Sequence, residues 1–286
     1  HERDDNVKRG IVSGPRTRFS LCLRMLWRMQ FAGIVVSACL GSSSVGIGLI
    51  YCFRRYIRLF IKSQKSRLFA WTLNRFMTKI NQILRKEKET VFRHLDSLRE
   101  KLDHPLTVLE VGAGPATNFD YYPRRTEIVC LEPNPYFKSY IEQNAHKHEN
   151  IHLSRVVQGF AERMDYLEDS SFDAVVCTLV MCSVRDPRQA LDEVKRVMKP
   201  GGIFIFVEHV AAGEGSFVNK IQQMMNPVWK TLCDGCNLTR NTAKYIQNTG
   251  FSDVNIVNFQ LQWGFRFLTL FIRPSIYGYA IKGTRI

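Results

Sequence analysis

A glycine-containing turn followed by an acidic residue is the first part of the sequence whose residue types and spacing suggest chemistry. Residues 110–116 read Glu-Val-Gly-Ala-Gly-Pro-Ala, and Gly112 and Gly114 permit a sharp turn whose backbone can approach a ligand closely. Glu132 follows about 20 residues later, where a carboxylate can accept both hydroxyls of a ribose. The dinucleotide pattern GxGxxG is not met, because its last position is Thr117. The pattern predicts a nucleoside ligand; the alternative is a structural turn with an unrelated glutamate.

Candidate catalytic residues lie further along the chain. His209 ends an apolar run that begins at Gly202, and as a base it would be oriented by Glu208 or Asp234. A structural role for His209 is an equal alternative, and Asp234 could instead stabilise a turn with its own side chain. Cys233 and Cys236 have CxxC spacing, but no second Cys/His pair stands nearby in the sequence. We therefore expect a turn there, and no metal.

These residues are expected at one edge of a parallel sheet. Apolar runs of strand length occupy 106–111, 128–131, 172–178 and 202–207, with helical patterns at 136–147 and 188–198. This alternation predicts an α/β fold, a doubly wound and mostly parallel sheet with helices on both faces. Ligands of such sheets bind beyond the carboxyl ends of the strands.

The positive charge is concentrated in the N-terminal third. Residues 1–106 contain 21 Lys and Arg against 8 Asp and Glu, whereas residues 107–286 contain 19 against 18. Positive charge beside a hydrophobic segment favours anionic lipid headgroups over nucleic acid as the partner. The cysteines are scattered at positions 22, 39, 52, 130, 177, 182, 233 and 236, which is typical of a reduced, cytosol-facing protein.

The segment Phe31–Phe53 is 23 residues long, carries no formal charge and is expected to be a membrane anchor. As a helix it would extend about 35 Å, enough to cross a bilayer. Gly41 and the three serines after it favour a re-entrant hairpin as an alternative. A cleaved signal peptide or a buried soluble helix would also fit this segment, although the apolar run is longer than a signal requires. Six basic residues between Lys8 and Arg28 are matched by six between Arg54 and Arg67, so charge predicts no orientation.

Between anchor and sheet, residues 54–104 form a basic region with helical periodicity. Apolar residues recur every three or four positions, at Phe69, Leu73, Phe76, Ile80, Ile83, Val91, Leu95, Leu98 and Leu102. This region is either packed on the following domain or lies at a membrane interface, with Trp71 and Phe76 at headgroup level and Arg75, Lys79 and Arg85 on lipid phosphate. The expected organisation is a basic extension (1–30), an anchor (31–53), this helical region (54–104) and a catalytic domain (105–286).

Several segments resemble class I S-adenosylmethionine-dependent methyltransferases of the type 11 group. They are VLEVGAGPATNF, CLEPNPYF, GFAERMDYLEDSSFDAVVCTLVMCSV and ALDEVKRVMKPGGIFIFVEHV. The later segment NPVWKTLCDGCNLTRNT, together with CTLVMCSV and the basic hydrophobic N-terminus, resembles the membrane-bound methyltransferase-like seven group of alkyl thiol S-methyltransferases. The resemblance covers about residues 66–284 and implies a Rossmann-like seven-stranded sheet.

The resemblance also implies positions for S-adenosylmethionine, whose product is S-adenosylhomocysteine. Glu110, Gly112, Ala113 and Gly114 would form the loop under the methionine part, and Glu132 would hold the ribose. Pro133, Asn134, Ala161 and Glu162 would surround the adenine, and Thr178 and Leu179 would flank the sulfonium. Ala116 replaces the usual third glycine, which is compatible with the start of a helix.

The expected activity is methyl transfer to a lipophilic small molecule, foremost an alkyl thiol, by an enzyme bound to membrane lipids. Thiols need little help from a base, because their pKa lies near 8.5. Residues 217–229 and 263–272 are rich in aromatics and are expected to cover the acceptor or to pack on the core or on lipid. The competing functions are C- or O-methylation of a quinone or sterol-type lipid, and a non-catalytic lipid-droplet or membrane interaction protein. The resemblance implies the endoplasmic reticulum or lipid droplets, with the catalytic domain in the cytosol.

Overall fold

The computed structural model describes residues 44–262 and 269–284, and the chain divides into two compact units, 1–65 and 66–286. The described part of the first unit is helical and belongs to α2 (Ser44–Ile83). Within the described residues, no helix has the length and apolar character needed to cross a membrane. Most of the expected anchor, residues 31–43, and the whole basic extension lie outside the described residues. The anchor therefore stays a prediction.

The second unit begins with the end of α2 and with α3 (Arg85–Arg99), which pack on the sheet. Ala70, Met77 and Ile80 of α2 are buried in the same core as Phe92 and Leu95 of α3. The opposite face of α2 remains open, because Trp71 and Phe76 are 54% and 49% exposed. The Arg75 guanidinium lies 5.7 Å from the centre of the Trp71 ring. One face of the helix thus packs on the domain as expected, while the residues assigned to lipid headgroups are available to solvent.

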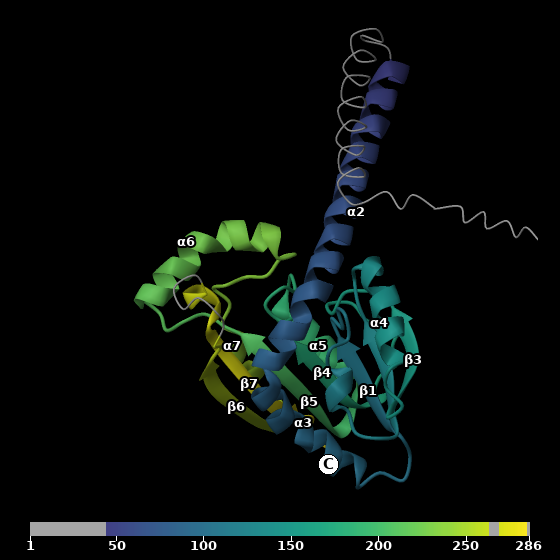
Figure 1. Cartoon of the computed structure of the whole chain (residues 1–286), viewed down its shortest axis with the longest axis vertical. Helices are drawn as coiled ribbons and strands as arrows, with labels where there is room; N and C mark the ends of the chain where they lie inside the picture. Colours follow the sequence, from purple (N-terminus) through teal and green to yellow (C-terminus); the bar gives the residue numbers. More distant parts are fainter. Residues whose placement is uncertain (1–43, 263–268, 285–286) are drawn as a thin grey trace, which may run out of the picture. The chain divides into compact units, whose positions relative to one another are not determined.

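Seven strands form one sheet in the order β3-β2-β1-β4-β5-β7-β6 (Figure 1). They are β1 (Leu106–Val111), β2 (Thr126–Leu131), β3 (Ile151–Val157), β4 (Phe172–Thr178), β5 (Met198–His209), β6 (Asp253–Gln260) and β7 (Pro274–Ile281). Neighbours are parallel except for β7, which runs antiparallel to both β5 and β6. The predicted mostly parallel, Rossmann-like sheet is confirmed. The chain reverses its direction of winding between β1 and β4, where such sheets bind ligands.

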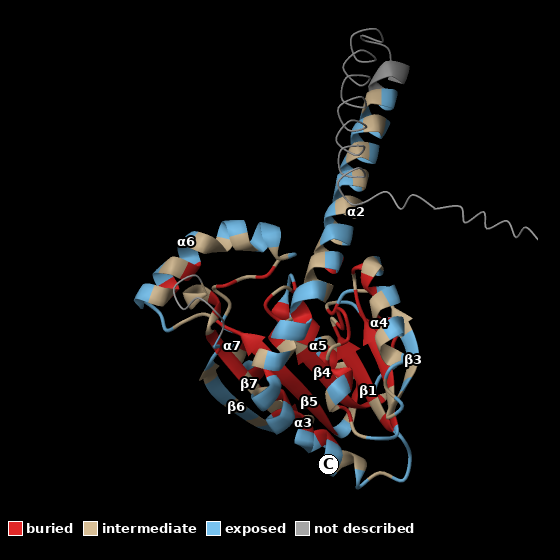
Figure 2. Cartoon of the chain, in the orientation of Figure 1, coloured by how far each residue is buried: buried red, intermediate tan, exposed pale blue. Residues whose placement is uncertain are grey.

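Helices cover both faces of the sheet. The α3 helix and α4 (Lys138–Ala145) pack on one face, whereas α5 (Pro187–Val197) and α7 (Thr242–Asn248) pack on the other. The remaining elements are α6 (Phe217–Leu232) and the 3-10 turns η1 (Phe119–Tyr121), η2 (Pro135–Phe137) and η3 (Leu270–Ile272). Figure 2 shows the central strands buried and the outer faces of the helices exposed. Burial on both faces explains why the central strands are continuous apolar runs.

Candidate cofactor and acceptor site

The glycine turn follows β1 directly and has the left-handed backbone that the sequence pattern predicts. Gly112 and Gly114 have φ angles of 63° and 52°. A Cβ on Gly112 would collide with the side chain of Val180, whereas at Gly114 the nearest atom would be the Gly112 carbonyl oxygen at 4.0 Å. The backbone at Gly114 therefore faces open space that a ligand can enter. Ala116 is also left-handed, with φ 60°, and no α-helix begins there, so the expected helix start is wrong.

Glu132 lies just beyond β2 and is bonded to the glycine turn. Its Oε2 accepts the N–H of Gly114 at 2.9 Å, and its Oε1 accepts the N–H of Asn134 at 2.9 Å. Burial raises the pKa of Glu132 to about 7, against the effect of these two hydrogen bonds. Each oxygen keeps a lone pair, so the carboxylate can still accept two ribose hydroxyls. The glutamate is therefore bonded to the glycine turn, and its binding of a ribose stays a prediction.

A buried network that sequence reasoning missed holds Glu110. Its carboxylate accepts hydrogen bonds from Asn118 Nδ2 at 3.0 Å and from the Tyr122 hydroxyl at 2.9 Å. Burial raises the pKa of Glu110 to about 7, while the bond from Tyr122 acts in the opposite direction. Asn118 Nδ2 also donates to Thr178 Oγ1 at 3.1 Å, which joins the ends of β1 and β4.

The hydrogen-bond network around Glu110 contains one buried oxygen that could accept a hydrogen bond from a positively charged ligand. Asn118 Oδ1 is buried and has no hydrogen-bond partner among the described residues. A buried acceptor without a partner is costly, and an ammonium group placed beside it would satisfy it. The methionine part of S-adenosylmethionine carries such a group, so this end of the site fits the cofactor. Asn118 lies within the segment VLEVGAGPATNF, where no role was expected for it, and Tyr122 lies outside every segment that resembles the family.

The residues expected around the adenine lie at the same edge of the sheet. Asn134 caps η2 by accepting the N–H of Tyr136 at 3.1 Å, directly after Glu132 and Pro133. Ala161 is buried. The Glu162 carboxylate accepts the backbone N–H groups of Arg185 and Asp186, so it links the segment after β3 to the residues before α5. These hydrogen bonds fix the positions of Asn134 and Glu162 in the ligand-free protein, and the contacts of all four residues with adenine stay a prediction.

The loop after β4 is fixed by Glu208. Its Oε1 accepts the N–H groups of Val180 at 2.8 Å and Met181 at 3.0 Å, and Leu179 beside them is left-handed with φ 58°. Burial raises the pKa of Glu208. Consecutive residues of a strand point to opposite faces, and Glu208 forms no hydrogen bond with His209 in the described structure. The expectation that Glu208 orients His209 is therefore wrong.

His209 instead contacts the turn after α6. Its Nε2 lies 2.8 Å from Cys236 Sγ, and the Trp229 indole donates to the same sulfur at 3.2 Å. The CxxC segment forms a turn as expected, with the Cys236 N–H donating to the Cys233 carbonyl at 3.0 Å. Asp234 is exposed and left-handed, with φ 47°, and lies near enough to Glu132 to raise the pKa of that carboxyl. The negative charge of Asp234 thus acts on Glu132, and the roles of His209 and Asp234 in catalysis stay predictions.

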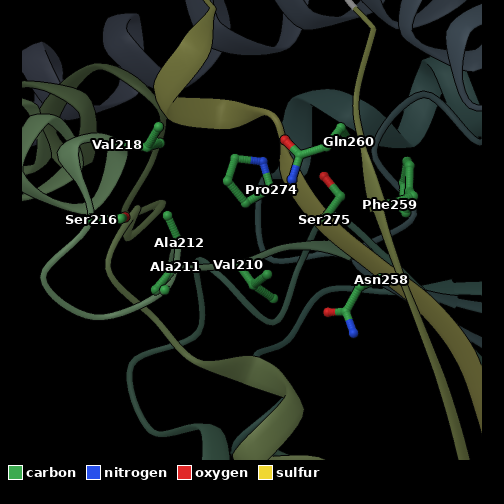
Figure 3. Close-up of a pocket in the computed structure, with 11 residues that line it drawn as sticks. Val210, Ala211, Ala212, Ser216, Val218, Asn258, Phe259, Gln260, Pro274 and Ser275 are labelled. Carbon is green, nitrogen blue, oxygen red and sulfur yellow. The ribbon is translucent and has the colours of Figure 1, made fainter.

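A cavity of about 250 Å³ lies next to His209 in the chain (Figure 3). It is bounded by the segment between β5 and α6, the end of β6 and the start of β7. The lining is mostly small or apolar, with Val210, Ala211, Ala212, Gly213, Val218, Phe259 and Pro274, and its polar members are Ser216, Asn258, Gln260 and Ser275. None of the expected cofactor residues lines it. The cavity is thus a candidate for the acceptor rather than for the cofactor.

The raised pKa of Glu132 predicts that cofactor affinity depends on pH. Only the ionised carboxylate offers acceptors to both ribose hydroxyls, and it is half protonated near pH 7 in the ligand-free protein. The affinity for S-adenosylhomocysteine should be constant above pH 8 and should fall by up to about tenfold per pH unit below 7. Calorimetric titration at pH 6, 7 and 8 measures this. In Glu132→Gln the pH dependence should become weaker but not vanish, because the pKa of Glu110 in the same site is also raised to about 7; an unchanged dependence would assign it to a group other than Glu132.

The raised pKa of Glu132 also makes the stability of the folded protein depend on pH. The pKa of Glu132 is higher in the folded protein than its ordinary 4.5, so the unfolded chain binds fewer protons between those values. Ionisation of Glu132 therefore makes the ligand-free protein less stable as the pH rises from about 4.5 to 7.

Comparison with known proteins identifies the family. Residues 109–206 match the family model described as "Methyltransferase domain". The chain is 38% identical to thiol S-methyltransferase TMT1B of Rattus norvegicus over 70% of its own length and 80% of that protein. It is 37% identical to thiol S-methyltransferase TMT1A of Homo sapiens over 75% of its own length and 86% of that protein.

Solved structures show the same fold at much lower identity. An O-methyltransferase family protein from Burkholderia thailandensis superposes with a TM-score of 0.52 at 12% identity, covering 76% of this chain and 60% of that one. A SAM-dependent methyltransferase from Methanosarcina mazei superposes with a TM-score of 0.50 at 16% identity, covering 66% of this chain and 97% of that one. With the site geometry above, the relatives show that this chain belongs to the family of TMT1A and TMT1B and is a class I methyltransferase with S-adenosylmethionine as its cofactor.

Proposed function

We propose that this enzyme methylates the thiol group of a lipophilic small molecule. The observation that carries the proposal is the identity of 36–38% to thiol S-methyltransferases, of which the chain covers 80–86%. Family membership also argues against a non-catalytic interaction protein. Methylation of a quinone or sterol-type lipid remains the competing activity.

The reaction would be an in-line displacement. The acceptor sulfur, as a thiolate, forms a bond to the methyl carbon while the bond from that carbon to the sulfonium sulfur breaks. The electron pair stays on the cofactor sulfur, which leaves as the neutral thioether S-adenosylhomocysteine. The protein's contribution is to position the two partners and exclude water. Glu132 and the Gly112–Gly114 turn would hold the nucleoside, and Glu110 and Asn118 the amino acid part.

The proposal is tested with the full chain, labelled S-adenosylmethionine, and an alkyl thiol beside a quinol of similar size. We expect label in the thiol at a rate at least tenfold above that in the quinol. Transfer to the quinol alone would overturn the thiol proposal and favour the lipid activity. Transfer to the alcohol analogue of the thiol at an equal rate would also contradict it, since an alcohol stays protonated at neutral pH and needs a base.

The cavity beside His209 would hold the apolar body of the acceptor. Ala212→Phe should fill much of its 250 Å³ volume and lower kcat/KM for a long-chain thiol about tenfold or more. A short thiol that does not reach the cavity should react almost as before. Ala243→Phe, outside the cavity lining, is the comparison variant. An equal loss for both chain lengths would show that the cavity does not hold the acceptor.

We further propose that the enzyme works at a membrane surface, with its catalytic domain in the cytosol and at the endoplasmic reticulum or lipid droplets. The support from the described structure is the outer face of α6. Phe217, Met224, Val228 and Leu232 are 56–73% exposed and share one side of the helix at spacings of seven and four residues. Such an apolar stripe suits insertion into the headgroup region.

Replacing part of this stripe should weaken membrane binding. For the chain from residue 66 onward, Met224→Glu with Val228→Glu should reduce flotation with anionic vesicles at least about fivefold, because two charges would enter the interface. Gln223→Glu with Lys230→Gln, elsewhere on the same helix, changes the net charge by the same two units and controls for charge alone. Equal loss in both double variants would assign binding to electrostatics, and no loss in either would contradict a role for the stripe.

A further inference from the structure

Three side chains from distant parts of the sequence meet near the carboxyl ends of β4 and β5. Cys182 lies in the loop after β4, His209 ends β5, and Cys236 lies in the turn after α6. One ligand atom from each lies within 4.8 Å of the other two, and all three residues are buried. The backbone ties the two cysteine segments together, because the Asn237 N–H donates to the Cys182 carbonyl at 2.9 Å. The arrangement is thus fixed by the fold rather than by a local motif.

The composition of this cluster is that of a zinc site. Two thiolate sulfurs and an imidazole nitrogen are preferred ligands of Zn²⁺, and in a tetrahedral site such atoms lie about 3.5 to 3.8 Å apart. Hydrogen bonds alone satisfy the cluster poorly, since His209 Nε2 faces the sulfur of Cys236 and sulfur is a weak hydrogen-bonding atom. The Trp229 indole N–H donates to Cys236 Sγ, as outer groups do to ligands of a metal.

We propose that Cys182, His209 and Cys236 bind one Zn²⁺ whose fourth position takes the sulfur of the acceptor thiol. Among the described residues, no fourth histidine, cysteine or acidic side chain joins the group. Three protein ligands with one position open to substrate is the pattern of catalytic zinc. Cys182 lies three residues after Leu179, which is expected to flank the sulfonium, so the open position would lie near the methyl group. The role of the zinc rests on the proposed thiol methylation.

The reaction balances without a redox step. The acceptor thiol loses its proton to solvent as its sulfur takes the fourth position, and it is then present as thiolate at neutral pH. That sulfur forms the bond to the methyl carbon as the carbon–sulfonium bond breaks, and the electron pair stays on the cofactor sulfur. The product thioether is neutral and leaves the zinc. His209 acts here as a ligand and not as a base.

The metal site is tested first without any assay of activity. The full chain is stripped with chelator and titrated with Zn²⁺ against a chromogenic competitor, and with Co²⁺ while its absorption is recorded. We expect one Zn²⁺ per chain and the thiolate-to-cobalt bands of a tetrahedral site. Loss of a direct ligand in Cys182→Ser or Cys236→Ser should weaken zinc binding by more than the roughly 100-fold seen for outer groups. Cys233→Ser, in the same turn but outside the cluster, is the matched control.

The outcomes separate this proposal from the proposed function. Retained binding of S-adenosylhomocysteine in each variant reports an intact fold. Removal of zinc should lower thiol methylation at least tenfold, and added Zn²⁺ should restore it. Thiol methylation by a wild-type chain that binds no zinc would overturn the metal site and leave the proposed function standing. Zinc binding with unchanged methylation after its removal would overturn the activating role. Zinc binding without any thiol methylation would overturn the proposed function and the activating role together, and leave a structural metal site.

Discussion

Glu132→Gln is expected to weaken binding of S-adenosylhomocysteine by on the order of 100-fold or more. The carboxylate accepts the N–H groups of Gly114 and Asn134 and would accept both ribose hydroxyls. A hydrogen bond to a charged group contributes about 1.5 to 3 kcal/mol, and the amide supplies only one accepting oxygen. Its NH₂ group would also face a backbone N–H that has lost its acceptor. Calorimetric titration of the full chain measures the loss.

Glu127→Gln is the matched control, because it makes the same change at the opposite end of the same strand. It should bind S-adenosylhomocysteine as the wild type does. Thermal unfolding of the ligand-free proteins shows whether the fold of Glu132→Gln is retained. A folded Glu132→Gln protein with less than threefold loss of affinity would mean that Glu132 only holds the glycine turn, and that another group binds the ribose.

The parts of the fold that the sequence predicts well are those whose signal is local. The strands β1, β4 and β5 are buried on both faces and therefore appear as uninterrupted apolar runs. The strands β3 and β6 are mostly half-buried or exposed, so their sequences resemble loops and no range was expected for them. The glycine turn and Glu132 were predictable because each directly follows a buried strand.

The residues that escaped prediction are those that only tertiary contacts bring to the site. Asn118 is an ordinary polar residue in sequence, and it gains its role by bonding to Glu110 and Thr178. The CxxC spacing in the sequence suggests Cys233 as the partner of Cys236. The fold instead places Cys236 against Cys182 and His209, the latter 27 residues away along the chain. Spacing rules find metal ligands on one hairpin or helix, but not a group of side chains from three separate segments of the chain.

Gly112→Ala is expected to be the most damaging small substitution in the site, with a loss of about 2 to 5 kcal/mol in the free energy of unfolding. The residue is left-handed, with φ 63°, which costs an alanine about 1 to 2 kcal/mol. The new methyl group would also collide with the Val180 side chain, and relief of such overpacking costs a further 1 to 3 kcal/mol or so. Denaturant unfolding followed by circular dichroism measures the loss.

A second substitution divides this loss into its two causes. Val180→Ala removes the two methyl groups that the new Cβ would meet at 2.4 and 2.8 Å, keeps the Cβ of residue 180 at 3.2 Å and leaves the backbone of residue 112 unchanged, so Gly112→Ala should cost less in the Val180→Ala background than in the wild type. The remaining cost is then the left-handed strain. Gly213→Ala, where a Cβ meets no atom within 4 Å and φ is not in the left-handed region, should cost less than about 1 kcal/mol. Equal costs for Gly112→Ala in both backgrounds would contradict the contact with Val180. Glycine would then be required at position 112 by its left-handed backbone alone.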